Sequence, residues 1–422
     1  MKFCVIGAGS GGRSFAAYLS SKGHSVSLYN RSYSRIHAIK QKGGIQAKGA
    51  LEGFFPIDLI TQDLKLAVKD TDVVMVVIPA SAHKDLAKKL ASILTMNQII
   101  ILNPGRTFGS VEFKRIIDSK GKYFVKVGET QTLLFTSRQL TENKVNIIKI
   151  KDSVNFSTFP ERYTQQVYDM LNDIFPQFNA VNNYLEVTLS NIGMLLHPAI
   201  SLLNAGMMDI GKNFKFYKEG ASSKVCKILE NIESELNEIF KKLDIKYLRY
   251  VRWAKKSYGV KTSSIFDALQ KIEAYENIYA PNRLITRYLT EDVPTGLVPI
   301  SSLAEFLNVQ TPTIDSIIHL SSILCGQNFK EKGRTLKKLK FFNFLINYLR
   351  EVRLRQDEER GYFPIKEIVS NPNDFKICSH CNCINSSKNK YCWVCHLKDF
   401  RKIDNFDLIK LRKNELKSLI RT

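Results

Sequence analysis

The stretch of sequence that decides the fold is Phe3-Cys4-Val5-Ile6 followed by Gly7-Ala8-Gly9-Ser10-Gly11-Gly12. Its apolar half predicts a short buried strand, and the amphipathic residues 13–21 behind it predict a helix. The glycines match the pattern G-x-G-x-x-G, in which the first permits a tight turn, the second lets the backbone approach a pyrophosphate, and the third lets helix and strand pack closely. The helix N-terminus offers free N–H groups to phosphates. We therefore predict that residues 7–12 bind a dinucleotide; the alternative is a tight turn without a ligand.

The end of the second predicted strand bears on which dinucleotide is bound. NAD sites usually carry Asp or Glu there, for the ribose hydroxyls. Here Asn30, Arg31 and Ser32 follow the strand, and none of them is a carboxylate. Arg31 suits a 2′-phosphate, with Ser32 as a hydrogen-bond donor and Arg35 nearby. The sequence favours NADP(H) over NAD(H); the alternative is that Arg31 is a solvated turn residue.

The first half of the chain alternates short apolar runs with amphipathic stretches. The predicted strands are residues 3–6, 26–29, 73–78, 99–102 and 123–127, and the predicted helices are 13–21, 83–94 and 111–119. A strand at 145–150 and a helix at 161–175 are predicted to close this domain. Such alternation predicts a mostly parallel sheet with helices on both faces. Pro79, Asn103 and Gly105 follow two of these strands and are predicted to contact the cofactor.

From about residue 186 the pattern changes to long helical periodicities. They cover residues 186–196, 223–243, 265–276, 301–307 and 313–324, and they predict an all-α domain. The predicted domains are a dinucleotide-binding domain at 1–185, a helical substrate and catalytic domain at 186–345, a charged connector at 346–374, a cysteine-rich module at 375–400 and a basic amphipathic tail at 401–422.

The composition narrows the class of protein. Hydrophobic residues at 44% and charged residues at 24% exclude a disordered chain. The longest clean apolar run, residues 73–80, is far shorter than the ~20 residues of a membrane-spanning helix. Residues 2–6 are too short for a signal peptide and lead straight into the glycines, so we expect a cytoplasmic protein. The net charge of +22 indicates anionic partners, a description that fits nucleotide phosphates and carboxylate substrates as well as nucleic acid.

Two residues of the helical part are candidates for acid–base chemistry. His197 precedes Pro198 in the first long helix, and a histidine titrating near neutral pH suits a proton transfer coupled to hydride transfer. Asp292, in Glu291-Asp-Val-Pro294, suits a residue that orients and polarises His197. The alternatives are a histidine of the core and an acidic turn.

Several stretches resemble the octopine/nopaline (opine) dehydrogenase family, in the expected order over roughly residues 1–340. They are residues 7–12, Asn103-Pro-Gly-Arg-Thr107, Glu129-Thr-Gln-Thr132, residues 191–204, residues 291–299, Val309-Gln-Thr-Pro312 and Gly333-Arg-Thr-Leu336. The His-Pro pair and the Glu-Asp-Val-Pro motif are the most specific. Related oxidoreductases with the same two-domain layout tend to use lysine in place of the histidine, so His197 favours the opine branch.

The resemblance implies a fold, a reaction and roles for residues. The fold would be an α/β Rossmann domain followed by an all-α dehydrogenase C-terminal domain like that of 6-phosphogluconate dehydrogenase. The enzyme would condense an amino acid with a 2-oxo acid, and NAD(P)H would reduce the resulting imine. His197 would be the acid/base, Asp292 its support, and Arg287 the ligand of a substrate carboxylate; the alternative for Arg287 is a surface salt bridge. Arg106 would line the cleft, and Glu129 and Thr132 are weaker candidates.

The cysteine cluster near the C-terminus predicts a metal site. Cys378-Ser-His-Cys381 and Cys392-Trp-Val-Cys395 are two C-x-x-C pairs, a spacing that suits four thiolates around a structural Zn²⁺. A disulfide framework is not expected in a reducing compartment. The module resembles a zinc ribbon, a type that binds nucleic acid or protein. Capping of the enzyme or formation of a homodimer is an alternative role.

Two other functions stay open at the level of sequence. In the first, the enzyme core is a nucleotide-sensing or scaffold module, and the ribbon binds nucleic acid or a partner protein. In the second, the chain is a related reductase that acts on a simple 2-oxo acid.

Overall fold

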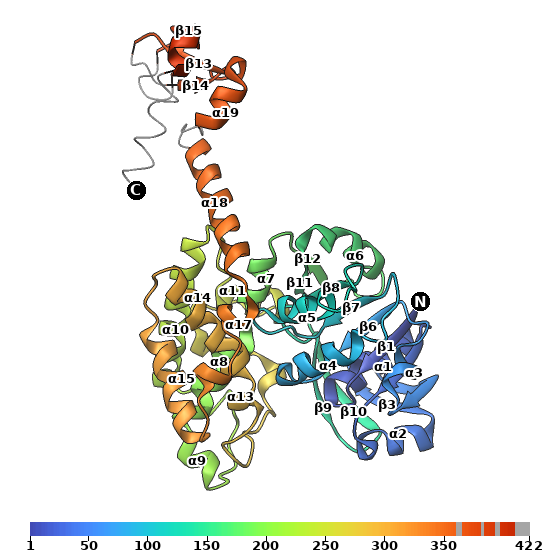
Figure 1. Cartoon of the computed structure of the whole chain (residues 1–422). Helices are drawn as coiled ribbons and strands as arrows, with labels where there is room; N and C mark the ends of the chain where they lie inside the picture. The colour runs from blue at the N-terminus through green and yellow to red at the C-terminus, as the bar shows by residue number, and fades with distance from the viewer. Residues whose placement is uncertain (360–364, 381–383, 393–396, 410–422) are drawn as a thin grey trace. The chain divides into compact units, whose positions relative to one another are not determined.

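The computed structural model describes residues 1–359, 365–380, 384–392 and 397–409 (Figure 1). The chain divides into two compact units, Met1–Leu339 and Lys340–Thr422, which are described separately. The first unit contains a sheet-based part and a helical part that lie side by side (Figure 1). The second is small and contains the cysteine cluster.

An eight-stranded sheet forms the centre of the sheet-based part, in the order β12-β11-β8-β7-β6-β1-β2-β5. Its strands are β1 (Lys2–Ile6), β2 (Ser25–Tyr29), β5 (Leu59–Thr61), β6 (Val73–Val76), β7 (Ile99–Leu102), β8 (Lys126–Thr130), β11 (Val154–Phe159) and β12 (Phe178–Ala180). All neighbours are parallel except β11 and β8. This is the predicted mostly parallel sheet, in which the carboxyl ends of β1, β6 and β7 meet at one edge.

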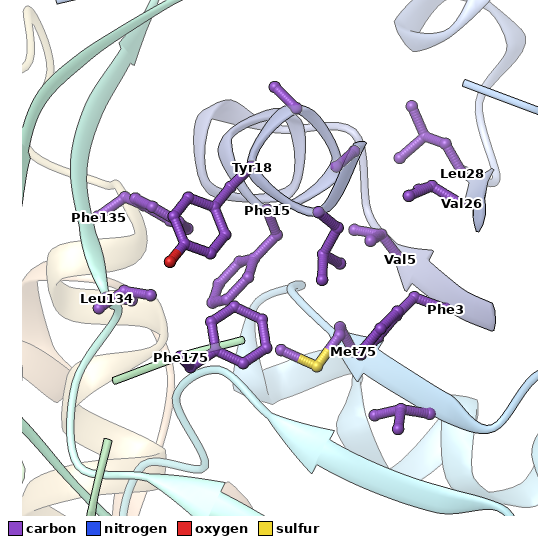
Figure 2. Close-up of a cluster of buried hydrophobic side chains, with 14 of the residues drawn as sticks. Phe3, Val5, Phe15, Tyr18, Val26, Leu28, Met75, Leu134, Phe135 and Phe175 are labelled. Carbon is purple, nitrogen blue, oxygen red and sulfur yellow. The ribbon is translucent and has the colours of Figure 1, made fainter. Parts of the chain in front are cut away.

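Side chains that alternate along β1 supply cores on both faces of the sheet. Phe3 and Val5 pack with α1 (Ser10–Ser21) and α6 (Thr164–Leu171) on one face. Phe15 of α1 lies among these buried hydrophobic side chains, with the rings of Phe135 and Phe175 as neighbours (Figure 2). Cys4 and Ile6 pack on the other face. The helices on that face are α3 (Leu64–Val68), α4 (His83–Leu90) and α5 (Gly109–Asp118).

A second sheet, absent from the sequence prediction, covers part of the first face. It has four strands in the order β4-β3-β10-β9, and α2 (His37–Lys42) leads into it. Its strands are β3 (Gly44–Gly49), β4 (Gly53–Pro56), β9 (Phe135–Gln139) and β10 (Lys144–Ile150). Residues 145–150, predicted as the last strand of this domain, do form strand β10, but it pairs with β3 and β9, and β11 and β12 follow it in the chain. An apolar run shows that a strand is buried but not which sheet it joins.

The helical part follows β12 and supplies the rest of the first unit. Its helices are α7 (Tyr184–Leu189), α8 (Ile192–Leu203), α9 (Ala205–Asp209), α10 (Ser223–Lys242), α11 (Tyr250–Tyr258), α12 (Ile265–Lys271), α13 (Arg287–Thr290), α14 (Val298–Phe306), α15 (Pro312–Leu324), α16 (Phe329–Lys332) and α17 (Leu336–Leu339). A π-helical turn, η5 (Val293–Leu297), precedes α14. Five long helices were predicted here, and the short ones lack enough residues to show a clear period.

One boundary in this part differs from the prediction in a way that matters for the site. Residues 186–196 form two helices, because Asn191 caps a new helix and its side chain accepts hydrogen bonds from the N–H groups of Gly193 and Met194. The new helix, α8, runs unbroken through Pro198, although proline has no N–H for the carbonyl four residues earlier. His197 therefore lies in the middle of a helix.

The second unit begins with α18 (Phe342–Glu359) and α19 (Ile365–Ser370). A small antiparallel sheet follows, in the order β14-β13-β15. Its strands are β13 (Phe375–Cys378), β14 (Ile384–Ser386) and β15 (Phe400–Lys402). Residues 410–422 of the predicted basic tail lie outside the described residues. Across the described part of the chain, no helix is both long enough and apolar enough to cross a bilayer.

Candidate active site

The glycine-rich turn has the geometry of a phosphate-binding loop. Gly7 has a φ of +112°, and a Cβ there would lie 2.3 Å from the carbonyl oxygen of Val77. A Cβ at Gly12 would lie 1.7 Å from the carbonyl oxygen of Gly7, so helix and strand touch at this position. Gly9 caps α1 without a side chain, and the space where its Cβ would point is open. An anionic group can therefore approach the first N–H groups of α1.

A cavity of about 420 Å³ lies beside this turn at the end of β2. Its lining includes Gly7, Asn30, Arg31, Ser32 and Pro79, which were all predicted to contact the cofactor. The side chain of Asn30 accepts a hydrogen bond from the N–H of Ala8, so Asn30 ties the turn to the end of β2. Arg35 and Lys89 line the same cavity. It is thus a cationic pocket adjoining the glycine turn, which fits the adenosine end of a dinucleotide.

A second cleft, of about 600 Å³, runs from the glycine turn to the helical part. Gly9, Ser10, Gly11, Pro79 and Asn103 line it on the side of the sheet. On the side of the helices, His197, Tyr217, Arg287, Tyr288 and Glu291 line it. Thr132 also lines the cleft. One continuous space therefore joins the predicted cofactor loop to the predicted catalytic histidine.

His197 and Asp292 are hydrogen-bonded to each other, although they are 95 residues apart in sequence. Nδ1 of His197 lies 2.8 Å from Oδ2 of Asp292, which is fully buried. Nε2 lies 2.9 Å from the hydroxyl of Tyr217. Because the carboxylate only accepts, Nδ1 carries the proton and the tyrosine hydroxyl donates to Nε2. Tyr288 stacks on the imidazole at 4.3 Å between ring centroids and fixes its plane.

Arg106 neutralises the acidic side of this arrangement. It is buried, and its Nη1 lies 2.9 Å from Oδ1 of Asp292, while its Nε donates to Oε1 of Glu291 at 3.1 Å. Glu291 also accepts a hydrogen bond from the N–H of Ala80, in the segment that follows β6. Arg106 comes from the loop after β7, so the ion pairs join the sheet to the helices directly behind His197. Sequence reasoning placed Arg106 in the cleft but did not find its two carboxylate partners.

Burial and the neighbouring charges set the protonation states of His197, Asp292 and Tyr217. Burial lowers the pKa of His197 below its ordinary value of 6.5, although Asp292 opposes the shift. Burial would raise the pKa of Asp292, but Arg106 and His197 outweigh it and hold that pKa below 3.8. Burial also keeps the pKa of Tyr217 well above 10. At neutral pH the site therefore contains an ionised aspartate, a neutral imidazole and a protonated tyrosine.

Arg287 stands at the start of α13 with its side chain exposed to the cleft. Its guanidinium lies 5.9 Å from the ring centroid of Tyr288, the residue that stacks on His197. Its charge contributes to the lowered pKa of His197. Within the described residues, Arg287 makes no ion pair, so the surface salt bridge considered for it is not formed there. Its position fits the binding of a small anion beside the histidine.

Residues from three of the family motifs pack against the loop that follows β7 and support it. A Cβ at Gly105 would lie 2.3 Å from Glu129, so Gly105 packs on that buried carboxylate and does not line either cavity. Oε2 of Glu129 accepts from the N–H of Ser110 at 2.7 Å. Arg334 donates to the carbonyl of Thr107 at 2.7 Å and pairs with Glu112 at 2.8 Å. Gly105, Glu129 and Arg334 thus support the loop that carries Asn103 and Arg106.

The cysteine cluster is described only in part. Cys378, at the end of β13, and Cys392 are both fully buried. The side chain of Asn385 on β14 lies 3.7 Å from Sγ of Cys392. Cys381 and Cys395, the other two predicted ligands, lie outside the described residues. No group of three or more potential metal ligands occurs in the part of the chain that is described.

Comparison with known proteins agrees with the fold of the first unit. Residues 180–325 match the family model of the NAD/NADP octopine/nopaline dehydrogenase, alpha-helical domain, and residues 2–108 match that of the NAD-dependent glycerol-3-phosphate dehydrogenase N-terminus. Over 338 residues the chain is 40% identical to an opine dehydrogenase of Arthrobacter sp. (strain 1C), with 80% of this chain and 94% of that protein covered.

Two solved structures show the same fold at low identity. Octopine dehydrogenase with NADH and L-arginine superimposes with a TM-score of 0.63 at 20% identity, covering 77% of this chain and 90% of that one. Yersinopine dehydrogenase with NADP⁺ bound superimposes with a TM-score of 0.64 at 16% identity, covering 76% and 90%. The predicted Rossmann domain followed by a helical domain is therefore confirmed. The family models end at residue 325, before the cysteine cluster.

Proposed function

Because the chain belongs to the opine dehydrogenase family and is an NAD(P)-dependent oxidoreductase acting on CH–NH donors, we propose that it joins an amino acid to a 2-oxo acid. The amine nitrogen attacks the carbonyl carbon of the oxo acid, water leaves, and the imine that remains is reduced to a secondary amine with two carboxylates. The observation that carries this proposal is the pairing of His197 with Asp292 in a cleft that continues to the glycine turn.

The residues present fit a bound dinucleotide. Gly9 leaves open space at the N-terminus of α1, and the cavity at the end of β2 offers Asn30, Arg31 and Ser32. When bound, the reduced nicotinamide supplies the hydride for the imine carbon. Asn103 and Pro79 line the cleft between the glycine turn and His197, and so would bound the nicotinamide end.

His197 would move the proton that accompanies reduction. Asp292 holds Nδ1–H, so Nε2 is the atom that faces the chemistry, and in the structure it accepts from Tyr217. A protonated His197 donates to the leaving hydroxyl when water is lost, and a neutral His197 takes a proton from the amine in the reverse reaction. The substrate would either displace the hydroxyl of Tyr217 from Nε2 of His197, or bind to that hydroxyl, which would then pass the proton between Nε2 and the substrate.

Arg287 would bind the carboxylate of the 2-oxo acid. A guanidinium presents two parallel N–H donors, which match the two oxygens of a carboxylate. Because Arg287 lies next to Tyr288, which stacks on the imidazole, a carboxylate bound to Arg287 would bring the neighbouring carbonyl carbon close to His197.

NADP(H) is the proposed cofactor, in preference to NAD(H). Support comes from Arg31, Arg35 and Lys89, which surround the cavity at the end of β2. Asp85 also lines this cavity, but from α4 and not from the end of β2 where a ribose-binding acid would stand.

A substrate screen tests the proposed reaction. Amino acids are crossed with 2-oxo acids, and oxidation of NADPH and of NADH is followed with the full chain. Turnover that requires both an amine and an oxo acid supports the proposal. Turnover with a 2-oxo acid alone would instead indicate a simple oxo acid reductase, and no turnover with any pair would count against both.

We also propose that Cys378, Cys381, Cys392 and Cys395 bind one structural Zn²⁺. Support comes from the two C-x-x-C pairs and from the burial of Cys378 and Cys392 within the small β13–β15 module, in which a bound metal would supply folding energy. Elemental analysis of the full chain should find about one zinc per chain. The Cys392→Ser variant should lose it, whereas Cys226→Ser, which changes a buried cysteine of the first unit, should keep it.

A further inference from the structure

Lys151 is a buried lysine in the substrate cleft that the proposed mechanism does not use. It follows β10 directly, where the second sheet meets α11, and its backbone N–H donates to the carbonyl of Leu134 at 3.0 Å. Only 5% of the residue is exposed, and it lines the same cleft as His197 and Arg287. Its position is therefore fixed by the sheet and faces the space in which the substrates would react.

The ammonium group of Lys151 has little to bind within the protein. It donates to the carbonyl of Leu133 and lies 5.8 Å from the ring centroid of Tyr258. Among the residues that the structure describes, none offers it a carboxylate within 4.0 Å. Arg106, which lines the same cleft, is paired with two carboxylates. Burial without a counter-charge lowers the pKa of Lys151 to about 7, and a bound carboxylate would favour the charged ammonium with its three donors, so Lys151 fits a site that is completed by an anionic ligand.

The proposed reaction supplies such an anion. Its product has two carboxylates, one from each substrate, and Arg287 accounts for only one of them. The guanidinium of Arg287 lies 5.9 Å from the ring centroid of Tyr288, which stacks on His197, whereas the ammonium of Lys151 lies against the ring of Tyr258. The carboxylate at Arg287 is therefore next to the reacting carbonyl carbon, and Lys151 is left for the carboxylate of the amine.

We propose that Lys151 binds the α-carboxylate of the amino donor, so that the substrate cleft has two separate carboxylate sites, Lys151 and Arg287. This inference rests on the proposed function. It implies that the donor is an amino acid and not a simple amine. The side chain of the donor would then lie against the aromatic part of the cleft, where Trp253, Tyr258 and Tyr275 line the wall.

Binding of two probes tests the inference without turnover. The first, 2,2′-iminodipropionate, is a secondary amine with two carboxylates, and the second, N-ethylalanine, lacks one of them. Calorimetry with the full chain saturated with NADP⁺ should show that the first binds at least ~10-fold more tightly. The Lys151→Met variant should lose this preference by weakening the binding of 2,2′-iminodipropionate alone. Lys144→Met, at the exposed start of β10, is the matched control and should keep it.

Steady-state kinetics give a second readout with the amino acid that the screen identifies. The Lys151→Met variant should raise the KM of the amino acid by ~10-fold or more and leave the KM of the 2-oxo acid within about twofold. The wild type should prefer the amino acid to its decarboxylated amine, and the variant should not. Unchanged NADPH affinity in the variant shows that the fold is intact.

The outcomes separate the two proposals. If the wild type turns over an amino acid with a 2-oxo acid, but Lys151→Met leaves the preference for two carboxylates unchanged, the role of Lys151 is wrong and the proposed function stands. If the wild type binds neither probe and turns over no pair of substrates, the proposed function is wrong and the two-carboxylate site falls with it.

Discussion

Arg106 and His197 contact opposite oxygens of one buried carboxylate: Nη1 of Arg106 lies 2.9 Å from Oδ1 of Asp292, and Nδ1 of His197 lies 2.8 Å from Oδ2. The arginine compensates the negative charge, so Asp292 stays ionised although it is fully buried. The aspartate in turn fixes the tautomer of the imidazole, with Nε2 left to exchange a proton.

Replacing Asp292 by Asn should abolish most of the activity without unfolding the site. The amide has nearly the shape of the carboxylate, but it no longer requires Nδ1 to carry the proton, so the imidazole can present the wrong nitrogen to the substrate. We expect kcat to fall by about 10²–10⁴-fold, as it should in His197→Ala, while the Kd of NADPH changes little. Turnover near that of the wild type in either variant would remove the pair from the mechanism.

The pH dependence of the reverse reaction should report the lowered pKa of His197. Oxidation of the secondary amine needs the neutral imidazole, so the rate should fall only as the pH drops through that pKa, which lies below 6.5. The Asp292 carboxylate raises this pKa, so its loss in Asp292→Asn should move the acid limb of kcat/KM to still lower pH. A limb that stays in place, or moves upward, would contradict this assignment.

Replacing Arg106 by Leu should destabilise the first unit. Its removal leaves the carboxylates of Asp292 and Glu291 buried without their cation, and breaking a buried pair costs about 3–5 kcal/mol. Denaturant unfolding should show this loss of free energy. Arg287→Leu is the control, because Arg287 is exposed and should change the KM of the 2-oxo acid with little effect on stability. Equal stability of the two variants would show that the Arg106 ion pairs contribute nothing net.

Replacing Arg31 by Ser should change the choice of cofactor. Loss of the guanidinium should raise the KM of NADPH by ~10-fold or more and leave the KM of NADH within about twofold, because only NADPH carries the 2′-phosphate. Lys42→Ser, an exposed change at the end of α2, should alter neither. A parallel rise in both constants would mean that Arg31 binds a part common to the two cofactors.

Replacing Arg334 by Leu should loosen the loop that carries Arg106. The guanidinium donates to the carbonyl of Thr107 and pairs with Glu112, and the backbone N–H of Arg334 donates to the carbonyl of Pro294 in η5. We expect a loss of about 2–4 kcal/mol in the free energy of unfolding, together with lower kcat. Rescue of most of the stability by Arg334→Lys would show that charge matters more than the fork of the guanidinium.

The elements predicted best are those with a strong local signal. Buried parallel strands read as continuous apolar runs, so β1, β2, β6 and β7 were found within about two residues at each end. Strand β8 was placed three residues too early, because the run from Tyr123 begins in the turn before it. The strands of the second sheet other than β10 were missed, since they are short and contain glycine or polar residues.

The sequence by itself determined the strand–glycine–helix start, the order of a sheet-based part before a helical part, the candidate histidine and the spacing of the cysteines. These depend on residues that are close together in the chain, where period and motif act directly. Only the tertiary structure decided that Asp292 reaches His197 across 95 residues, that Arg106 compensates it, and that Lys151 faces the same cleft. The physical reason is that a buried charge requires a partner of opposite charge. Tertiary packing brings such partners together from elements that are far apart in the chain, and no local sequence pattern shows which elements will meet.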